Sequence, residues 1–481
     1  MKFMSIKNIS SFWIKSLIVG VSLTFSSCEK ILELDPKQSI DSSTALESQD
    51  GIESTLISVY SRLQNYQHYG RDMLALAEAL SDNAIHTGNS SHLINEAANN
   101  RGSHFDLWQN CYYSINEINL VLEALENSAG QYAEGWANDI YGQAYFLRAL
   151  LYHNLARAYA YDPTAIIQER NKGGVPLMLT AVNDLSKIGE LKRASIEDTY
   201  KQIYADLEAS IASFSGSDEQ GLYPYKGNSY AAKALFSRVA LYNGDWQKVV
   251  DMANDALSNK KSVFSTVVNY VDDWKKETHP ESIFELRYNE SENIGSDRSL
   301  RATYTSRAFY ESENFTIQAV IAVNPDFYSL FSEDDVRKGV YRKGVGNNQS
   351  YWEVYKFISK NGVMNLDNVP VLRESELYLN RAEAYYHLNQ LEDCRDDVNT
   401  IRNRAGLDDF ETLDAALLDE VLLQRRLELA FEGHRWFDLK RRGEDIIKES
   451  GNLTFDDYRL LAPIPDREVK IDGKLEQNYN Y

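Results

Sequence analysis

Arg148-Ala149-Leu150-Leu151-Tyr152 is a short stretch of sequence with two related copies further along the chain, Arg238-Val239-Ala240-Leu241-Tyr242 and Arg381-Ala382-Glu383-Ala384-Tyr385. In each copy an arginine and a tyrosine stand four residues apart, which places both on one face of a helix. Two copies are followed by a turn and a second helical segment, at Asn243-Gly244-Asp245 and at His387-Leu388-Asn389. Such a helix pair cannot bury its own apolar face, so it must stack on neighbouring pairs.

Helical spacing of apolar residues extends through most of the chain. It covers 52–66, 105–127, 136–160, 196–213, 229–258, 372–404 and 415–441. Ser195, with Asp198 three residues later, fits a helix start of the capping-box type. Long insertions separate the copies, but stacked helix pairs of this kind are typical of tetratricopeptide-like repeats. The sequence therefore predicts a mainly α fold, with a tetratricopeptide-like helical scaffold at 49–260 and 371–445.

Two parts of the chain lack this helical period. In the segment 261–370, Gly, Asn, Ser and aromatic residues alternate with charges, and 446–481 is also irregular. Ile283 to Tyr288 is the clearest strand candidate. We therefore predict that a loop-rich subdomain accompanies the helical scaffold within one domain, 49–481.

The composition restricts the class of function. The chain has 481 residues and a formal net charge of −21, which disfavours general binding to phosphate backbones and predicts no nucleic-acid partner. Its 31 tyrosines are amphipathic contact residues, common in helix packing and on surfaces that hold polar ligands.

Three cysteines are too few for a disulfide scaffold. Cys111 and Cys394 are predicted to be buried free thiols on helices, although a disulfide between them is the alternative.

The first 27 residues have the pattern of a signal peptide. Three lysines precede a short apolar run from Leu17 to Phe25, which is well below the roughly 20 residues needed to span a bilayer. Ser26-Ser27-Cys28 resembles a bacterial lipobox, with Phe25 where leucine is usual. We therefore predict lipidation at Cys28 and a polar tether over 28–48. A plain secretory signal that ends near a cysteine is the alternative.

No catalytic or metal motif stands out. The sequence has no H-E-x-x-H, C-x-x-C, G-x-S-x-G, P-loop or G-x-G-x-x-G pattern. Glu428, Glu432 and Asp438 would suit a glycosidase that uses paired carboxylates. The alternative is a packed helix with local ion pairs, Glu428 to Arg425 and Glu432 to Arg435 or Arg426. We therefore predict a binding protein rather than an enzyme.

The most specific motif of the chain is RLELAFEGHRWFDLKR at 426–441. It resembles the pattern RRxELAFEGhRWFDLkR of the SusD/RagB family of outer-membrane nutrient-binding lipoproteins. The closing 463–465 (PIP) and 477–481 (QNYNY), the early Trp108 motif and 142–149 (GQAYFLRA) add to the resemblance. Gln143 and Gln424 stand where the family often has glutamate, and Tyr479 where proline is common, which leaves the assignment intact.

The resemblance implies a fold of about four tetratricopeptide-like helix pairs with an irregular subdomain. It also implies a lipid-anchored outer-membrane protein, facing the cell exterior, that captures glycan and delivers it to a TonB-dependent transporter of the SusC type. Capture of oligopeptides, or a scaffold that binds no ligand, are the alternatives. No cofactor is expected, and the sequence leaves open whether calcium assists.

Sugar binding needs flat aromatic rings together with carboxylates, amides and arginines for the hydroxyl groups. Two segments, 66–92 and 274–352, combine such residues outside the regular helices. The alternatives are a solvated loop after a helix end for the first and packing aromatics for the second. The predicted ligand-binding residues are Tyr66, Arg71, Asp72, Asp82, Asn83, His86, Trp274, Tyr304, Phe309, Tyr310 and Trp352.

Overall fold

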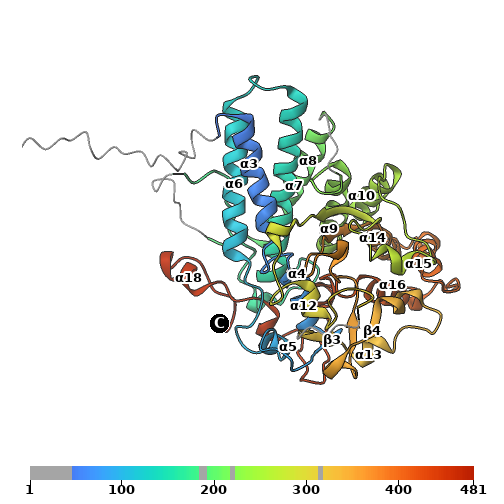
Figure 1. The fold of residues 1–481 in the computed structure, drawn as a ribbon. Helices are drawn as coiled ribbons and strands as arrows, with labels where there is room; N and C mark the ends of the chain where they lie inside the picture. Colours follow the sequence, from blue (N-terminus) through green and yellow to red (C-terminus); the bar gives the residue numbers. More distant parts are fainter. Residues whose placement is uncertain (1–45, 184–191, 217–222, 313–317) are drawn as a thin grey trace, which may run out of the picture.

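The computed structural model describes residues 46–183, 192–216, 223–312 and 318–481 (Figure 1). The predicted signal peptide 1–27, the lipidation site Cys28 and nearly all of the tether 28–48 lie outside these residues. Within the described ranges, no helix combines the length and the apolar character that crossing a membrane requires. Cys111 and Cys394 are buried free thiols, as predicted.

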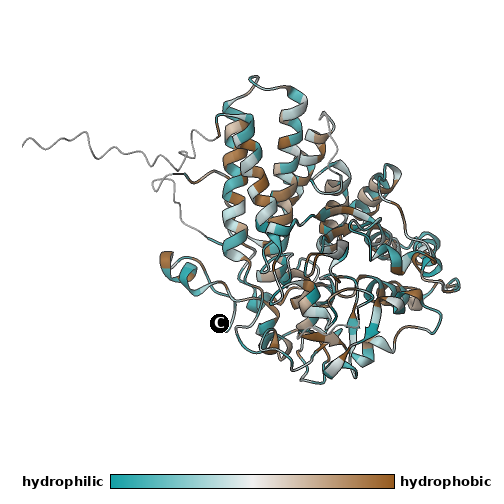
Figure 2. Cartoon of the chain, viewed as in Figure 1, coloured by the Kyte–Doolittle hydropathy of each residue, from teal (hydrophilic) through white to brown (hydrophobic). Residues whose placement is uncertain are grey.

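Four long helices form an upright group at one end of the molecule (Figure 1). They are α3 (Gln49–Leu63), α6 (Trp108–Asn127), α7 (Glu134–Tyr159) and α8 (Ile196–Phe214). Helix α8 begins as predicted, because the Ser195 side chain accepts a hydrogen bond from the backbone N–H of Asp198. Hydrophobic and hydrophilic residues are mixed along these helices (Figure 2). Helices α3, α6 and α8 each bury one face in a common core, whereas α7 is buried on all sides from Phe146 to Tyr159.

The helical scaffold continues with α9 (Ser229–Asn243), α10 (Trp246–Ser258), α14 (Glu374–His387), α15 (Leu391–Arg404), α16 (Ala415–Leu429) and α17 (Arg435–Arg441). Helix α9 packs on α10, and α14 packs on both α10 and α15. Gly244 ends α9 in the left-handed region at φ 70°, and Asp245 caps α10. The mainly α, tetratricopeptide-like fold is confirmed.

The arginine of each repeat copy reaches an acidic residue on a helix packed against its own. Arg148 Nη2 lies 2.6 Å from Asp206 Oδ1, which joins α7 to α8. Arg238 Nη2 lies 2.5 Å from Glu376 Oε2, which joins α9 to α14. Arg381 Nη2 lies 2.6 Å from Asp397 Oδ1, which joins α14 to α15. In each copy, the repeated arginine therefore joins its helix to another helix packed against it.

Several short strands lie in the segment 261–370, as predicted, but β1 lies within 49–260, which the sequence assigned to the helical scaffold. One antiparallel sheet has the order β1 (Ala84–His86), β3 (Ile321–Val323), β5 (Trp352–Val354) and β4 (Tyr341–Lys343). A second pairs β2 (Ser282–Leu286) with β6 (Val369–Arg373). The first sheet matters for the site, because β1 comes from the early predicted ligand segment and the other three strands come from the later one.

Short helices complete the fold. The α-helical ones are α4 (Asp72–Ala79), α5 (Ile94–Ala97), α11 (Tyr270–Asp273), α12 (Leu300–Tyr304), α13 (Pro325–Tyr328) and α18 (Asp466–Asp472). The 3₁₀ turns are η1 (Gln168–Arg170), η3 (Glu290–Glu292), η4 (Val336–Val340), η5 (Gly346–Asn348), η6 (Lys360–Gly362) and η7 (Tyr458–Leu460).

The helix predicted over 415–441 is interrupted, which corrects the interpretation of its apolar spacing. Helix α16 ends at Leu429, and α17 begins at Arg435. Between them Phe431 has φ 63° and Gly433 has φ 90°. A Cβ atom on Gly433 would lie 2.3 Å from the carbonyl oxygen of Met73, so only glycine fits this close approach. The turn therefore packs tightly against α4.

Candidate functional site

Tyr66 lies in the turn after α3, and arginines approach its half-buried ring. The guanidinium carbon of Arg298 is 4.1 Å from the ring centroid, and that of Arg71 is 5.3 Å away. Arg71 Nε donates a 2.6 Å hydrogen bond to Asp72 Oδ1. Burial raises the pKa of Asp72, against the lowering effect of Arg71. Arg71 and Asp72 are only 6% and 5% exposed, so Tyr66 and Arg298 present this group to solvent.

A second contact extends the group. His92 Nε2 lies 2.9 Å from Asp297 Oδ1, and the Asp297 carboxylate is 61% exposed. Arg298 Nε is 3.6 Å from the other oxygen of the same carboxylate. An aromatic ring, a guanidinium, an imidazole and a carboxylate are therefore gathered from two loops.

Further contacts connect these loops to the edge of the sheet. His86 Nε2 lies 2.9 Å from the carbonyl oxygen of His92. Asn89 Nδ2 donates a 2.6 Å hydrogen bond to Asn348 Oδ1. Tyr351 donates its hydroxyl proton to the carbonyl of Thr87 across 3.3 Å. The two segments predicted to hold ligand are thus brought together, since β1 also pairs with β3 and β3 with β5.

Trp352, at the start of β5, keeps part of its ring accessible. The indole stacks on Tyr328 with ring centroids 4.2 Å apart and an interplanar angle of 15°. Lys343 Nζ lies 4.4 Å from the Trp352 ring centroid. We give the name loop face to seven accessible residues from these two loops and from the start of β5: Tyr66, Asn89, His92, Asp297, Arg298, Tyr351 and Trp352.

Three of the predicted residues lie in the core instead. Trp274, Tyr304 and Asn83 are each 0% exposed. Tyr304 donates a 3.3 Å hydrogen bond to the carbonyl of Phe431, and Asn83 donates to Glu78 Oε2 at 2.9 Å. Their aromatic and polar signal comes from internal packing, which leaves no ring face or amide for a ligand.

Asp82 is held by the C-terminal signature block. Arg435 Nε lies 2.7 Å from Asp82 Oδ1, and Arg426 Nη2 lies 3.1 Å from Oδ2. Burial opposes ionisation, but the hydrogen bond and charge of Arg435 and the charge of Arg426 lower the pKa of Asp82 overall. Asp82 therefore serves as an anchor between the early loop and α16–α17.

Two predicted residues lie beside β4. Tyr310 is 9% exposed, and its ring centroid lies 3.9 Å from the Arg342 guanidinium carbon and 4.1 Å from Lys275 Nζ. Phe309, its neighbour in the chain, is half-buried. The ring of Tyr310 is therefore engaged by basic residues outside the loop face.

The carboxylates of the signature block form a buried ion-pair network, but with partners other than the local ones expected. Glu428 Oε1 lies 3.0 Å from Arg373 Nη2, and Glu428 Oε2 lies 2.5 Å from Arg404 Nη2. Glu432 pairs with Lys356 at 2.5 Å and with Arg373 at 2.7 Å. Burial opposes ionisation of Glu428, but Arg404 and Arg373 hold its pKa below its usual range. An enclosed, ion-paired carboxyl with a lowered pKa is unsuited to transfer protons to a substrate.

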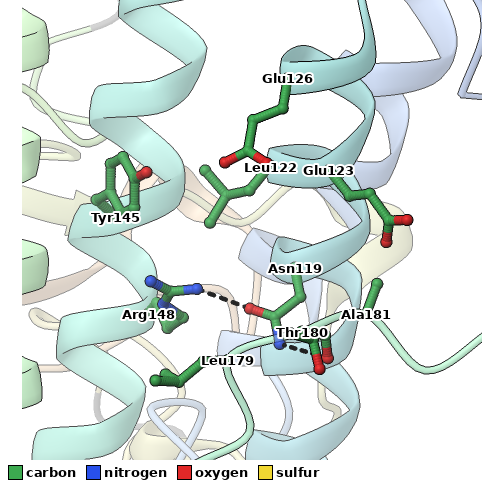
Figure 3. Close-up of a pocket in the computed structure, with 9 residues that line it drawn as sticks. All are labelled: Asn119, Leu122, Glu123, Glu126, Tyr145, Arg148, Leu179, Thr180 and Ala181. Atoms are coloured by element: carbon green, nitrogen blue, oxygen red, sulfur yellow. Dashed lines mark hydrogen bonds between the residues drawn. The ribbon is translucent and has the colours of Figure 1, made fainter. Parts of the chain in front are cut away.

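Sequence reasoning missed three residues of the loop face and one cavity. His92, Asp297 and Arg298 are not among the predicted ligand-binding residues, although they lie within the predicted segments 66–92 and 274–352. The signal for Asp297 and Arg298 is the polar, glycine-containing character of 289–298. A cavity of about 580 Å³ lies between α6 and α7 (Figure 3). Its lining residues are Asn119, Leu122, Glu123, Glu126, Tyr145, Arg148, Leu179, Thr180 and Ala181.

Metal binding finds no support in the part of the chain that the structure describes. Within it, no three His, Cys, Asp or Glu side chains are grouped so that they could hold an ion. Whether calcium assists ligand binding, which the sequence leaves open, is not tested by these observations.

Relatives of this chain share its overall plan. One curated relative is SusD-like protein P25 of Formosa agariphila, which is 23% identical over 96% of this chain and 98% of that protein. Another is a SusD-like protein of Bacteroides ovatus, which is 22% identical over 96% of this chain and 88% of that protein. A SusD superfamily crystal structure from Bacteroides thetaiotaomicron has a TM-score of 0.79 at 23% identity, covering 89% of this chain and 99% of that one. A putative sugar binding protein from Bacteroides vulgatus has a TM-score of 0.77 at 24% identity, covering 90% and 98%.

Family models match both halves of the sequence. The model of the SusD family matches residues 337–481, which include the signature block. A second model, described as starch-binding associating with outer membrane, matches residues 32–241. The motifs, the helical scaffold and these matches agree, and the chain belongs to the SusD family.

Proposed function

We propose that this protein is a cell-surface glycan-binding lipoprotein that captures an oligosaccharide or polysaccharide at the loop face. The observation that carries the proposal is the convergence of two loops, from 64–92 and 289–298, on an accessible group of aromatic and polar side chains. Sugars are recognised by ring faces that meet C–H groups and by polar groups that both donate and accept hydrogen bonds.

The loop face offers both kinds of contact. Tyr66, Tyr351 and Trp352 are half-buried, so part of each ring reaches solvent. Asp297 accepts hydrogen bonds, and Arg298 donates them. The descriptions of a matching family model as starch-binding and of one structural relative as a putative sugar binding protein support a glycan ligand.

Anchoring and hand-off extend this proposal. Lipidation at Cys28 would hold the protein on the outer membrane, and a TonB-dependent transporter of the SusC type would receive the glycan. The resemblance in sequence and the description of a matching family as associating with the outer membrane support this arrangement. The proposed role is binding without catalysis, and the enclosed, ion-paired state of Glu428 and Glu432 supports it.

Oligopeptide capture is the second candidate. It is favoured by the mixed charges of the loop face, because His92, Asp297 and Arg298 could pair with peptide termini as well as with hydroxyl groups. Mass spectrometry of ligand released from protein purified from its native cells separates the two, since it identifies sugar or peptide directly.

Affinity gels with a panel of polysaccharides test the proposal. Wild-type protein is expected to be retarded by at least one glycan, and Tyr66→Ala and Trp352→Ala are expected to migrate faster in that gel. Tyr113→Ala is the matched control, since Tyr113 is a 51% exposed tyrosine on α6, outside the loop face. Absence of retardation on every glycan, or equal loss in the control, would contradict the proposal.

A further inference from the structure

The cavity between α6 and α7 is separate from the loop face in its residues and in its supporting elements. Its volume of about 580 Å³ lies within the roughly 300–1,000 Å³ typical of small-molecule sites. Helix α6 contributes Asn119, Leu122, Glu123 and Glu126, α7 contributes Tyr145 and Arg148, and 179–181 closes the third side (Figure 3).

Arg148 and Asn119, which we call the floor of the cavity, are held by hydrogen bonds, and Asp206 compensates the charge of Arg148. Arg148 Nη1 donates a 2.8 Å hydrogen bond to Asn119 Oδ1, while Nε and Nη2 donate to Asp206 at 2.9 and 2.6 Å. Asn119 Nδ2 in turn donates to the carbonyl of Met178 at 2.9 Å. These bonds hold the floor in one arrangement, as a preformed ligand site requires.

The walls are partly apolar and partly aromatic. Leu122 and Leu179 contribute methyl groups, and Leu179 is 43% exposed. The half-buried ring of Tyr145 lies one helical turn from Tyr141, and the two rings stack at 14° with centroids 6.2 Å apart. A flat ring beside methyl groups suits the C–H face of a sugar ring.

Three polar groups of the cavity have unused hydrogen-bonding capacity. The carboxylate of Glu126 and the hydroxyls of Tyr145 and Thr180 form no hydrogen bond with another described residue. Figure 3 shows Glu126 pointing from α6 toward the helix that carries Tyr145, while Glu123 points the other way. Burial raises the pKa of Tyr145, with Arg148 opposing and Asp206 and Glu126 adding to the rise, so its hydroxyl stays a donor.

We propose that this cavity is a second ligand site, which takes a mono- or disaccharide unit without negative charge. Sugar hydroxyls donate to Glu126 and accept from Tyr145 and Thr180, while the ring lies against Tyr145 and Leu122. Glu126 points toward the helix that carries Tyr145, and its negative charge repels carboxylate or sulfate groups, which disfavours anionic sugars. The site does not depend on the loop face, because the two share no residue.

Leucine methyl NMR on the full-length protein tests this directly, because Leu122 and Leu179 both line the cavity. The probes are maltose, cellobiose, lactose and N,N′-diacetylchitobiose, with digalacturonate as the anionic comparison. We expect saturable shifts of the Leu122 and Leu179 methyls with at least one neutral probe and none with digalacturonate. The proposal would be overturned if digalacturonate caused the same shifts with an affinity equal to that of a neutral probe, or if no neutral probe caused a shift.

Two variants assign the binding to the cavity. Glu126→Gln changes an exposed side chain and should fold normally, yet it should weaken binding about tenfold through loss of a charge-assisted hydrogen bond. Tyr145→Ala should abolish the shifts of both leucines. Tyr66→Ala should leave these shifts unchanged, which separates this site from the proposed function of the loop face. Unchanged affinity in Glu126→Gln and Tyr145→Ala would contradict the proposal.

Discussion

His92 Nε2 lies 2.9 Å from Asp297 Oδ1, and this contact joins two loops that are 205 residues apart in the chain. The Asp297 carboxylate is largely exposed, so the pair holds its partners in place without enclosing them. It therefore fixes the spacing between Tyr66 and the polar groups that surround it.

Breaking this contact should affect binding more than folding. We expect Asp297→Ala to lower the free energy of unfolding by less than about 1 kcal/mol, because a polar contact to such an exposed side chain contributes little. The same change should weaken glycan binding, since it removes an acceptor and frees both loops. Calorimetric titration and urea unfolding of one protein preparation measure the two effects. A large stability loss with unchanged affinity would show that Asp297 has only a structural role.

Replacing Gly433 should destabilise the protein more than replacing another glycine with a similar positive φ. Gly433→Ala places a Cβ atom 2.3 Å from the Met73 carbonyl, at φ 90°. Gly88→Ala is the matched control, since Gly88 has φ 82° but no atom within 4 Å of a Cβ. The control should cost about 1 kcal/mol from backbone strain alone, and Gly433→Ala should cost clearly more. Equal unfolding midpoints in denaturant for the two variants would refute the close packing of this turn on α4.

The repeat arginines should carry much of the stability of the helical scaffold. Arg238 is 2% exposed and pairs with Glu376 at 2.5 Å. Arg238→Ala should destabilise the protein by about 3–5 kcal/mol, because it leaves a buried carboxylate unpaired. Lys201→Ala, which removes the exposed ion pair to Glu197, should leave the melting temperature almost unchanged. Thermal unfolding followed by circular dichroism measures both, and similar losses would argue against the role of the repeated arginine.

Glu78 gives a prediction about pH. Burial raises the pKa of this 0% exposed carboxyl from 4.5 to about 7, and the hydrogen bond from Asn83 opposes the rise. A raised carboxyl pKa means that the folded state binds the proton more tightly than the unfolded state. Stability from this group is thus complete below pH 4.5 and is lost as the pH rises through 7. Glu78→Gln should flatten the pH dependence of unfolding across this window, and an unchanged slope would contradict the assignment.

The helical scaffold could be predicted because its signals are local. The Arg148, Arg238 and Arg381 copies, the Asn243-Gly244-Asp245 turn and the Ser195 cap each act within a few residues. The acidic partners Asp206 and Glu376 could not be predicted, because they lie 58 and 138 residues from their arginines along the chain. The turn at Phe431 and Gly433 was missed because apolar spacing continues across it, while the close approach of Gly433 to Met73 depends on tertiary packing.

The site was predictable at the level of segments rather than of residues. Aromatic and polar residues outside helices marked 66–92 and 274–352, and contacts do join these segments. Composition could not separate the accessible Trp352 from the buried Trp274, because burial depends on the packing of distant elements. Tyr145 and Glu126 gave no signal, since each lies on a regular helix and their proximity arises from the packing of α6 on α7.

A crystal structure with the oligosaccharide that the affinity gels identify tests the central claim most directly. The account predicts sugar at the loop face, with a ring against Tyr66 or Trp352 and hydroxyl groups within hydrogen-bond distance of Asp297 or Arg298. Sugar bound only away from these residues, with the loop face empty, would contradict it.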